Sequence, residues 1–503
     1  MVQILNIYTI SLFVALGGAL FGLDVASMSV ILGTRQYKNY FGNPLGTRQG
    51  TITSAMAAGS FFGALSSSFL GDQFSRKVAI QVGALLWCIG SVVQSTSNGV
   101  PMLIAGRIIS GLCIGLTSSL VPIYQSEIAP RKIRGRLLSI QQYALSWGFM
   151  LQYFVQYGCS FINSQAAFRL PWATQAIPAI ILFIGLFWFP RSPRWLASKD
   201  RWDEVLHVIA FLRTANSDIN NPIVLAEYKE IEDQIRLERD QESNSFHELF
   251  SRKMRNRVFL SMAIQVWTQL CGASMLAYYL VYIFQSAGIK NYLLASAILY
   301  SIFVIVPIPT ILWTDRWGRR PSLLIGSIFL AFWLFLIGGL LMRYGEPNSD
   351  PNQPITWVIV DHLAVSRTIL ACSYLFLSTF ALSWGPVSLM YSPEIIPLRI
   401  RAKSVSLATA SNWAVNFAQG FAVPPLLRST TWRLYFIFGS FNIAAFIHVL
   451  VAAPETKQRT LEEMDEVFEH REPLWKSFTG GRVSSRLEEL AMDIEMCELR
   501  RQG

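Results

Sequence analysis

Long apolar runs, separated by short charged segments, dominate the pattern of residues along this chain of 503 residues. A helix needs about 20 consecutive apolar residues to cross the hydrocarbon core of a bilayer. Runs of this kind predict twelve membrane-spanning helices, near residues 7–31, 51–70, 78–97, 101–124, 137–156, 171–189, 258–285, 293–313, 321–342, 366–391, 403–426 and 432–452. The pattern therefore predicts an all-α membrane protein.

A charged stretch divides the twelve runs into two sets of six. Residues 191–257 have helical periodicity but are too polar to span a bilayer, so we expect a small cytoplasmic helical linker domain there. It separates an N-terminal six-helix half, residues 1–190, from a C-terminal six-helix half, residues 258–453. The polar residues 454–503 predict a cytoplasmic tail.

Lysine and arginine concentrate in alternate loops between the runs. The rich loops lie at residues 76–77, 131–136, 316–320 and 399–403. The loops on the other side are poorer in these residues, except the first, which contains Arg35, Lys38 and Arg48. The positive-inside rule places the rich loops in the cytoplasm, and both termini with them. We expect a multi-pass protein of the plasma membrane.

Composition fits a membrane protein and excludes several classes of function. Charged residues make up 15% of the chain, whereas soluble proteins carry about 25%. Cytoplasmic loops account for the net charge of +10, and no basic module predicts binding to nucleic acid. The sequence holds no CxxC pair, metal-ligand cluster, phosphate loop or nucleophile triad. We expect no enzyme activity, no cofactor and no metal.

An internal repeat relates the two halves. The segment Glu127-Ile128-Ala129-Pro130-Arg131-Lys132-Ile133-Arg134 recurs as Glu394-Ile395-Ile396-Pro397-Leu398-Arg399-Ile400-Arg401, with Glu, Ile, Pro, Ile and Arg at identical offsets. Each copy follows the fourth span of its half. Two parallel six-helix repeats predict a pseudo-two-fold axis along the membrane normal and a substrate site between the halves.

Acidic and basic residues are matched at the cytoplasmic ends of the spans in both halves. The N-terminal set is Asp72, Arg76, Glu127 and Arg134, and the C-terminal set is Asp315, Arg319, Glu394 and Arg401. Ion pairs among these side chains could close the cytoplasmic side in one state and break in the other. Topology alone would need only the basic residues, so the duplicated acids favour a cytoplasmic gate.

Several motifs occur together in a fixed order. They are Gly17-Gly18-Ala19-Leu20-Phe21-Gly22-Leu23-Asp24, Gly106-Arg107, Pro122-Ile123-Tyr124-Gln125-Ser126-Glu127, Pro190-Arg191-Ser192-Pro193-Arg194-Trp195-Leu196, Asp315-Arg316-Trp317-Gly318-Arg319-Arg320 and Pro454-Glu455-Thr456-Lys457. With them, nearly the whole chain resembles a sugar porter of the major facilitator superfamily. The tenth and eleventh spans are most similar to the fungal monosaccharide/proton symporters. The resemblance implies the major facilitator fold, with twelve transmembrane helices in two six-helix halves.

An acid lies within the otherwise apolar first span. An intramembrane ionisable residue such as Asp24 indicates a functional site by default, and Arg107 in the fourth span is its natural partner. The resemblance implies that this pair forms a proton switch, in which Asp24 binds Arg107 when charged and releases it when protonated. A static buried ion pair is the alternative, and such a pair adds little stability.

The resemblance also indicates a sugar site. A sugar needs polar groups for its hydroxyls and an aromatic surface for its C–H face. The candidate substrate-binding residues are Gln142, Gln269, Ser274, Tyr278, Trp384, Asn412 and Trp413. Isolated amides such as Gln175 also join helices, and we expect that role for Gln175. Asn416 is a further in-membrane amide.

Five positions depart from the family pattern. Thr268 and Ser274 replace amides in the seventh span, and Leu389 stands where many relatives place a sugar-stacking Trp. Arg191 replaces the acid of the Pro-Glu-Ser-Pro-Arg motif, and Ser75 replaces a glycine. Because these pocket residues differ from the family pattern, the resemblance does not identify which substrate is transported.

We therefore expect a secondary active transporter, with proton-coupled uptake of a monosaccharide by alternating access. Two alternatives stay open. One is transport of another polyol, an acid sugar or a secondary metabolite on the same scaffold. The other is a sugar sensor that does not transport, although such sensors carry longer tails. The expected partners are the small-molecule substrate, protons and the lipid bilayer, and we expect a monomer.

Overall fold

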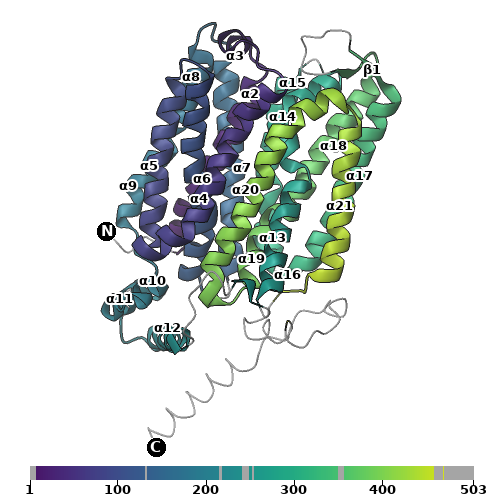
Figure 1. The fold of residues 1–503 in the computed structure, drawn as a ribbon. Helices are drawn as coiled ribbons and strands as arrows, with labels where there is room; N and C mark the ends of the chain where they lie inside the picture. The colour runs from purple at the N-terminus through teal and green to yellow at the C-terminus, as the bar shows by residue number, and fades with distance from the viewer. Residues whose placement is uncertain are drawn as a thin grey trace, which may run out of the picture.

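The computed structural model describes residues 7–130, 133–214, 218–240, 249–251, 254–289, 291–348, 356–457 and 468, without the side chains of 134, 234, 237–240, 313–316 and 398–399. Two groups of long helices stand side by side (Figure 1). The N-terminal group, purple to blue, lies on one side, and the C-terminal group, green to yellow, on the other. Helices α10, α11 and α12 lie beyond one end of the N-terminal group, the end opposite α3.

The N-terminal half follows the six predicted spans. Its helices are α1 (Ile7–Val14) with α2 (Leu16–Ile31), α4 (Thr47–Phe74), α5 (Arg76–Ser95), α6 (Val100–Ile128), α7 (Arg134–Cys159), and α8 (Ala166–Thr174) with α9 (Ala176–Gly185). A short helix, α3 (Arg35–Phe41), follows the first span. Helix α2 packs along α7, and α6 packs between α4 and α5.

The C-terminal half repeats the pattern with more broken helices. Its helices are α13 (Arg255–Leu270) with α14 (Ala273–Ser286), α15 (Tyr292–Ile305) with α16 (Pro307–Trp317), α17 (Arg319–Tyr344), α18 (Leu363–Leu382) with α19 (Trp384–Glu394), α20 (Leu398–Ser429) and α21 (Arg433–Ala452). Gly272 separates α13 from α14 with φ of 94°, a left-handed conformation that L side chains rarely adopt. Strands β1 (Gly345–Pro347) and β2 (Trp357–Ile359) form one antiparallel pair.

Nine segments among the described residues are long and apolar enough to cross a membrane by themselves. The other three spans are α4, α7 and α20, which have 28, 26 and 32 residues and are more polar. Helix α4 packs against α20 across the two halves, and α7 packs against α15 and α16. These helices can be polar because other helices, rather than lipid, cover much of their surface.

Three helices lie between the halves along the chain. They are α10 (Pro193–Ser198), α11 (Trp202–Arg213) and α12 (Pro222–Asp240). They bury a small core of their own, which includes Leu196, Val205 and Ile231. Arg213 binds both carboxylate oxygens of Glu227, at 2.6 and 2.7 Å, and also donates to the Ile128 carbonyl at the end of α6. The linker helices are therefore tied to each other and to the N-terminal half.

Candidate functional site

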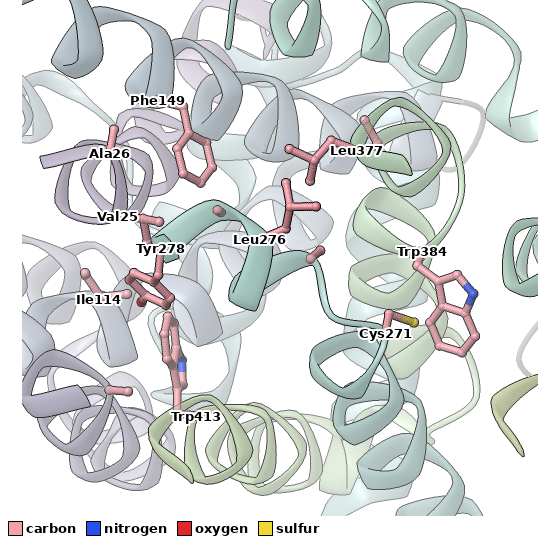
Figure 2. Packing of buried hydrophobic residues seen from close by; sticks show 14 of the residues in the cluster. Val25, Ala26, Ile114, Phe149, Cys271, Leu276, Tyr278, Leu377, Trp384 and Trp413 are labelled. Atoms are coloured by element: carbon pink, nitrogen blue, oxygen red, sulfur yellow. The ribbon is translucent and has the colours of Figure 1, made fainter. Parts of the chain in front are cut away.

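A cavity of about 130 Å³ lies between the two halves. Helices α2, α6 and α7 of the N-terminal half line it, together with α13, α14, α15, α18, α19 and α20 of the C-terminal half. A cavity of about 150 Å³ holds one benzene molecule, so the space suits a single six-membered ring. Figure 2 shows Phe149 and Leu377 on one side of this region and Trp413 on the other. The cavity is where the repeat predicts the substrate site.

A cluster of amides forms the polar wall of the cavity. Gln269 Nε2 donates to Asn412 Oδ1 at 2.8 Å, and Asn412 Nδ2 donates to Gln265 Oε1 at 3.0 Å. Ser274 Oγ donates to Gln269 Oε1 at 2.6 Å, and Asn416 Nδ2 donates to the same oxygen at 3.1 Å. The hydrogen bonds fix the orientation of each amide, so the wall presents a defined set of donors and acceptors.

Gln142 approaches the cavity from the opposite half. It extends from α7, and its side-chain amide has no hydrogen-bond partner among the described residues. Gly385 on α19 gives it room, because a Cβ at that position would lie 3.1 Å from Gln142 Nε2. An amide that lines a cavity and bonds to no other described residue is ready to bind a polar ligand.

Trp413 lines the cavity and joins the two halves. Its Nε1 donates to Ser118 Oγ on α6 at 3.1 Å. Its ring and the Phe21 ring on α2 form an edge-to-face pair with centroids 4.9 Å apart. A helix of the C-terminal half therefore places an aromatic surface against two helices of the N-terminal half. A ligand in the cavity would lie beside a side chain that both halves hold in position.

Two of the predicted substrate-binding residues do not line the cavity. Trp384 is fully buried and donates through Nε1 to Ser327 Oγ on α17 at 3.0 Å, which turns its ring away from the cavity (Figure 2). Tyr278 is also buried, and its hydroxyl donates to Asn416 Oδ1 at 3.4 Å. The structure therefore keeps both of these candidate residues out of the cavity wall. Gln175, expected to be structural, donates to the Leu23 carbonyl.

The cavity also contains residues that the sequence did not single out. Gln265 lies one turn before Gln269 on α13, so the four-residue spacing could have indicated that both amides share a face. Phe149 and Phe380 also form apolar parts of the wall, as does Leu389, which the sequence had marked as a departure from the family pattern. Leu389 therefore occupies the cavity wall but offers neither a ring nor a polar group.

Asp24 and Arg107 form a buried ion pair in the N-terminal half. Arg107 Nη2 donates to Asp24 Oδ2 at 2.8 Å, and neither side chain has exposed surface. Among the described residues, Asp24 Oδ1 and Arg107 Nε and Nη1 have no hydrogen-bond partner. Phe21 and Val25, on either side of Asp24 in the sequence, line the cavity. The charged pair thus lies beside the cavity, but not in its wall.

The acids and bases that the sequence predicts at the cytoplasmic ends of the N-terminal spans form a cluster. Arg76 Nη1 lies 3.0 Å from Asp72 Oδ1, and Arg76 Nε lies 3.3 Å from Glu127 Oε1. These contacts join the start of α5 to the ends of α4 and α6. The side chain of Arg134 lies outside the described residues, so its predicted part in the cluster stays a prediction.

The C-terminal half has a corresponding cluster with an added acid. Arg319 Nη2 lies 2.9 Å from Glu394 Oε1, and Thr456 Oγ1 donates to Glu394 Oε2 at 2.6 Å. The carboxylate of Glu455 accepts from the backbone N–H groups of Arg319 at 2.9 Å and Arg320 at 3.1 Å, which caps α17. Arg401 donates to the Ile396 carbonyl. The side chain of Asp315 lies outside the described residues.

The equivalent cap in the N-terminal half is built differently. Arg191 occupies the place of the motif acid, and its guanidinium lies 5.4 Å from the Trp195 ring. Ser75 Oγ instead accepts from the Val78 N–H at the start of α5, at 3.4 Å. Ser75 has φ of 93° and ψ of 151°, close to the values of 86° and 153° at Gly318. The two halves therefore share this turn but not the acid that caps it.

Comparison with known proteins assigns these features to a family. The family model described as "Sugar (and other) transporter" matches residues 10–468. The chain belongs to the sugar transporter family. The match confirms the resemblance seen in the sequence motifs. The protein is a transporter and not an enzyme.

Relatives in the sugar transporter family align over nearly the whole chain. The MFS glucose transporter mfs1 of Aspergillus flavus is 49% identical over 506 residues, which cover 98% of this chain and 95% of that protein. The high-affinity glucose transporter of Kluyveromyces lactis is 40% identical over 482 residues, which cover 94% of this chain and 87% of that protein.

A solved structure confirms the major facilitator fold. The proton:xylose symporter XylE, bound to 6-bromo-6-deoxy-D-glucose, matches with a TM-score of 0.76 and 25% sequence identity. The match covers 92% of this chain and 99% of that chain. Twelve spans in two six-helix halves, with a cavity between them, therefore make this chain a multi-pass membrane transporter.

Proposed function

We propose that this chain couples the uptake of a monosaccharide to the inward movement of protons by alternating access. The observation that carries the proposal is the Asp24–Arg107 pair, which is fully buried beside the cavity and leaves polar atoms of both residues without partners. A buried pair of this kind is weak evidence for stability, because desolvation offsets the attraction. A functional role therefore explains it better than a structural one.

The proposed proton step follows from electrostatics. With Asp24 charged, its carboxylate holds the Arg107 guanidinium at 2.8 Å between α2 and α6. A proton on Asp24 removes the negative charge, so the attraction is lost while Arg107 stays charged. Helices α2 and α6 can then change position relative to each other. Proton binding and helix movement are linked, as symport requires.

The cytoplasmic clusters support alternating access. Ion pairs of Arg76 and Arg319 join helix ends within each half, at the end of the molecule where the linker helices α10 to α12 lie. In the proposed cycle, opening the cavity to that side moves the helix ends within each half relative to one another, and these pairs oppose that movement. We propose that the pairs stabilise the state in which the cytoplasmic side is closed.

The geometry of the cavity supports a monosaccharide as substrate. The space fits one six-membered ring, and the amides of Gln142, Gln269 and Asn412 match sugar hydroxyls, which both donate and accept. Trp413 supplies the aromatic surface. The relatives are named glucose transporters, and XylE is named a proton:xylose symporter, so hexoses and pentoses are the first substrates to test.

The apolar part of the wall favours a second candidate substrate class. Phe380 and Leu389 can satisfy no hydroxyl, and burying a hydroxyl without a hydrogen bond costs about 1–3 kcal/mol. A polyol, acid sugar or secondary metabolite with one apolar edge would fit this wall. The same uptake assay distinguishes the two classes when such compounds compete with the labelled sugar.

We also propose the plasma membrane as the location, with both termini in the cytoplasm, and a monomer as the transporting unit. The basic loops and the linker helices, which gather at one end, support this orientation.

The decisive experiment is uptake of a panel of radiolabelled hexoses and pentoses in a yeast strain that lacks its own sugar transporters. Uptake is measured at acidic and neutral pH, with and without a protonophore. We expect accumulation of at least one sugar at acidic pH and loss of that accumulation with the protonophore. Uptake of none of the sugars would contradict the substrate class, and uptake unchanged by the protonophore would contradict the coupling.

A further inference from the structure

Tyr278 and Asn416 are hydrogen-bonded to each other beside the cavity residues Gln269 and Ser274. Both side chains are buried, and neither lines the cavity wall. Tyr278 is on α14 and Asn416 is on α20, and the Tyr278 hydroxyl donates to Asn416 Oδ1 at 3.4 Å. The two residues therefore form a hydrogen-bonded bridge, the Tyr278–Asn416 bridge. One end is directed to the charged pair and the other to the polar wall of the cavity.

The tyrosine end of the bridge faces the charged pair. Helix α14 packs against α2, which carries Asp24, and Tyr278 lies within electrostatic reach of both Asp24 and Arg107. Among the described residues, Tyr37 on α3 and Tyr279 on α14 also lie within electrostatic reach of Arg107. A change in the charge of Asp24 would thus act on the Tyr278 hydroxyl.

The asparagine end of the bridge reaches the sugar site. Asn416 Nδ2 donates to Gln269 Oε1 at 3.1 Å and to Ser274 Oγ at 3.3 Å, and both of those residues line the cavity. Gln269 then donates to Asn412 at 2.8 Å. A rotation of the Asn416 amide would change which donors and acceptors the polar wall offers to a sugar hydroxyl.

Resting on the proposed function, we propose that the Tyr278–Asn416 bridge couples the protonation of Asp24 to the affinity of the cavity for sugar. Two positioning residues, neither of which touches the substrate, then link a site in the N-terminal half to one in the C-terminal half. The 3.4 Å contact between them is longer than the usual O–H···O distance of about 2.5–3.0 Å, so it can tighten when the field of the charged pair changes.

Tyr279 provides a contrast within the same helix. It is also buried and also within reach of Arg107, but its hydroxyl donates to the backbone carbonyl of Gly420 at 2.7 Å. A backbone carbonyl cannot turn as an amide side chain can, and Gly420 does not line the cavity. The bridge through Tyr278 is therefore specific, and Tyr279→Phe is a matched control that removes an equivalent hydroxyl.

The test is the dependence of KM on pH in proteoliposomes. For the wild type, coupling between two sites typically changes affinity by about 5- to 150-fold, so we expect KM for the sugar to shift at least about 5-fold between acidic and neutral pH. Tyr278→Phe keeps the ring and removes the hydroxyl. We expect its KM to become independent of pH, while Tyr279→Phe keeps the wild-type shift.

Further variants separate this proposal from the proposed function. Asn416→Ala breaks the other end of the bridge and should also abolish the shift; it supplies the test if Tyr278→Phe does not fold. The double variant should behave like either single variant. A pH-dependent KM in Tyr278→Phe or Asn416→Ala, like that of the wild type, would overturn the bridge alone. A wild type without pH-dependent transport would overturn the bridge and the proton coupling together.

Discussion

Arg107 donates to Asp24 at 2.8 Å, and both side chains are completely buried. Removing one partner of such a pair leaves a buried charge without compensation and typically costs about 3–5 kcal/mol. A proton on Asp24 has the same effect on Arg107, unless the surrounding helices move. When Asp24 becomes neutral, the present arrangement of the helices around Arg107 is therefore destabilised and a rearrangement is favoured.

The first prediction concerns Asp24→Asn, which mimics the protonated state permanently. We expect the variant to lose protonophore-sensitive accumulation, because it has no carboxylate to bind and release a proton. Its transport should no longer vary with pH. Uptake into yeast measures both properties, and Ser27→Ala, one turn away on α2, is the control. Accumulation that survives the change would remove Asp24 from the coupling mechanism.

The second prediction concerns the amide that approaches the cavity from the N-terminal half. Gln142→Ala should raise KM about 2- to 13-fold, because one hydrogen bond to a sugar hydroxyl contributes about 0.5–1.5 kcal/mol. Gln152→Ala is a matched control on α7, since Gln152 donates to the Pro171 carbonyl and does not line the cavity. Equal changes in KM for the two variants would argue against Gln142 as a sugar ligand.

The third prediction separates the two tryptophans of spans ten and eleven. Trp413→Phe removes the bond to Ser118 in the cavity wall and should raise KM. Trp384→Phe removes the bond to Ser327 outside the cavity. It should lower the free energy of unfolding by about 1 kcal/mol and leave KM unchanged. Substrate titration and thermal unfolding in detergent measure these effects. The opposite assignment of the two effects would refute the observed placement of the rings.

The fourth prediction concerns the turn at the start of α5. Ser75 occupies a backbone region that is essentially restricted to glycine, which costs about 1–3 kcal/mol. Ser75→Gly relieves this strain, but it also removes the weak bond to the Val78 N–H and gives the unfolded chain more freedom. The net effect should be to raise the free energy of unfolding by about 1 kcal/mol. Gly318→Ser is the reciprocal change and should destabilise. An unchanged or lower unfolding temperature for Ser75→Gly would contradict the strain argument.

The sequence predicted the spans and the partnership of Asp24 with Arg107 more successfully than it predicted the cavity wall. Apolar length identifies a helix, and a buried acid needs a base, so both follow from local residue types. Whether Trp384 or Trp413 faces the cavity depends on how each helix is rotated. The break at Ser383, with φ of −123° and ψ of −90°, sets the direction of Trp384 and is not encoded by a glycine or proline at that position.

The sequence placed Tyr278 among the candidate substrate-binding residues, but it does not line the cavity, for a related reason. Its residue type suits a sugar contact, and its place in span seven is near other predicted ligands. The break at Gly272 and the packing of α14 against α2 instead direct it towards the charged pair. Tertiary packing decided its role, and residue type alone could not.

The polar character of α4, α7 and α20 also constrains how the protein is made. Helix α20 carries Asn412, Asn416 and Gln419, and each of these amides is bound by groups on α13 or α14 in the folded protein. In lipid alone, those amides would have no partners. Because α13 and α14 precede α20 along the chain, they are available when α20 enters the bilayer. Substitutions that weaken this docking should first reduce the amount of protein that reaches the membrane, before any change in the transport rate of the molecules that arrive there.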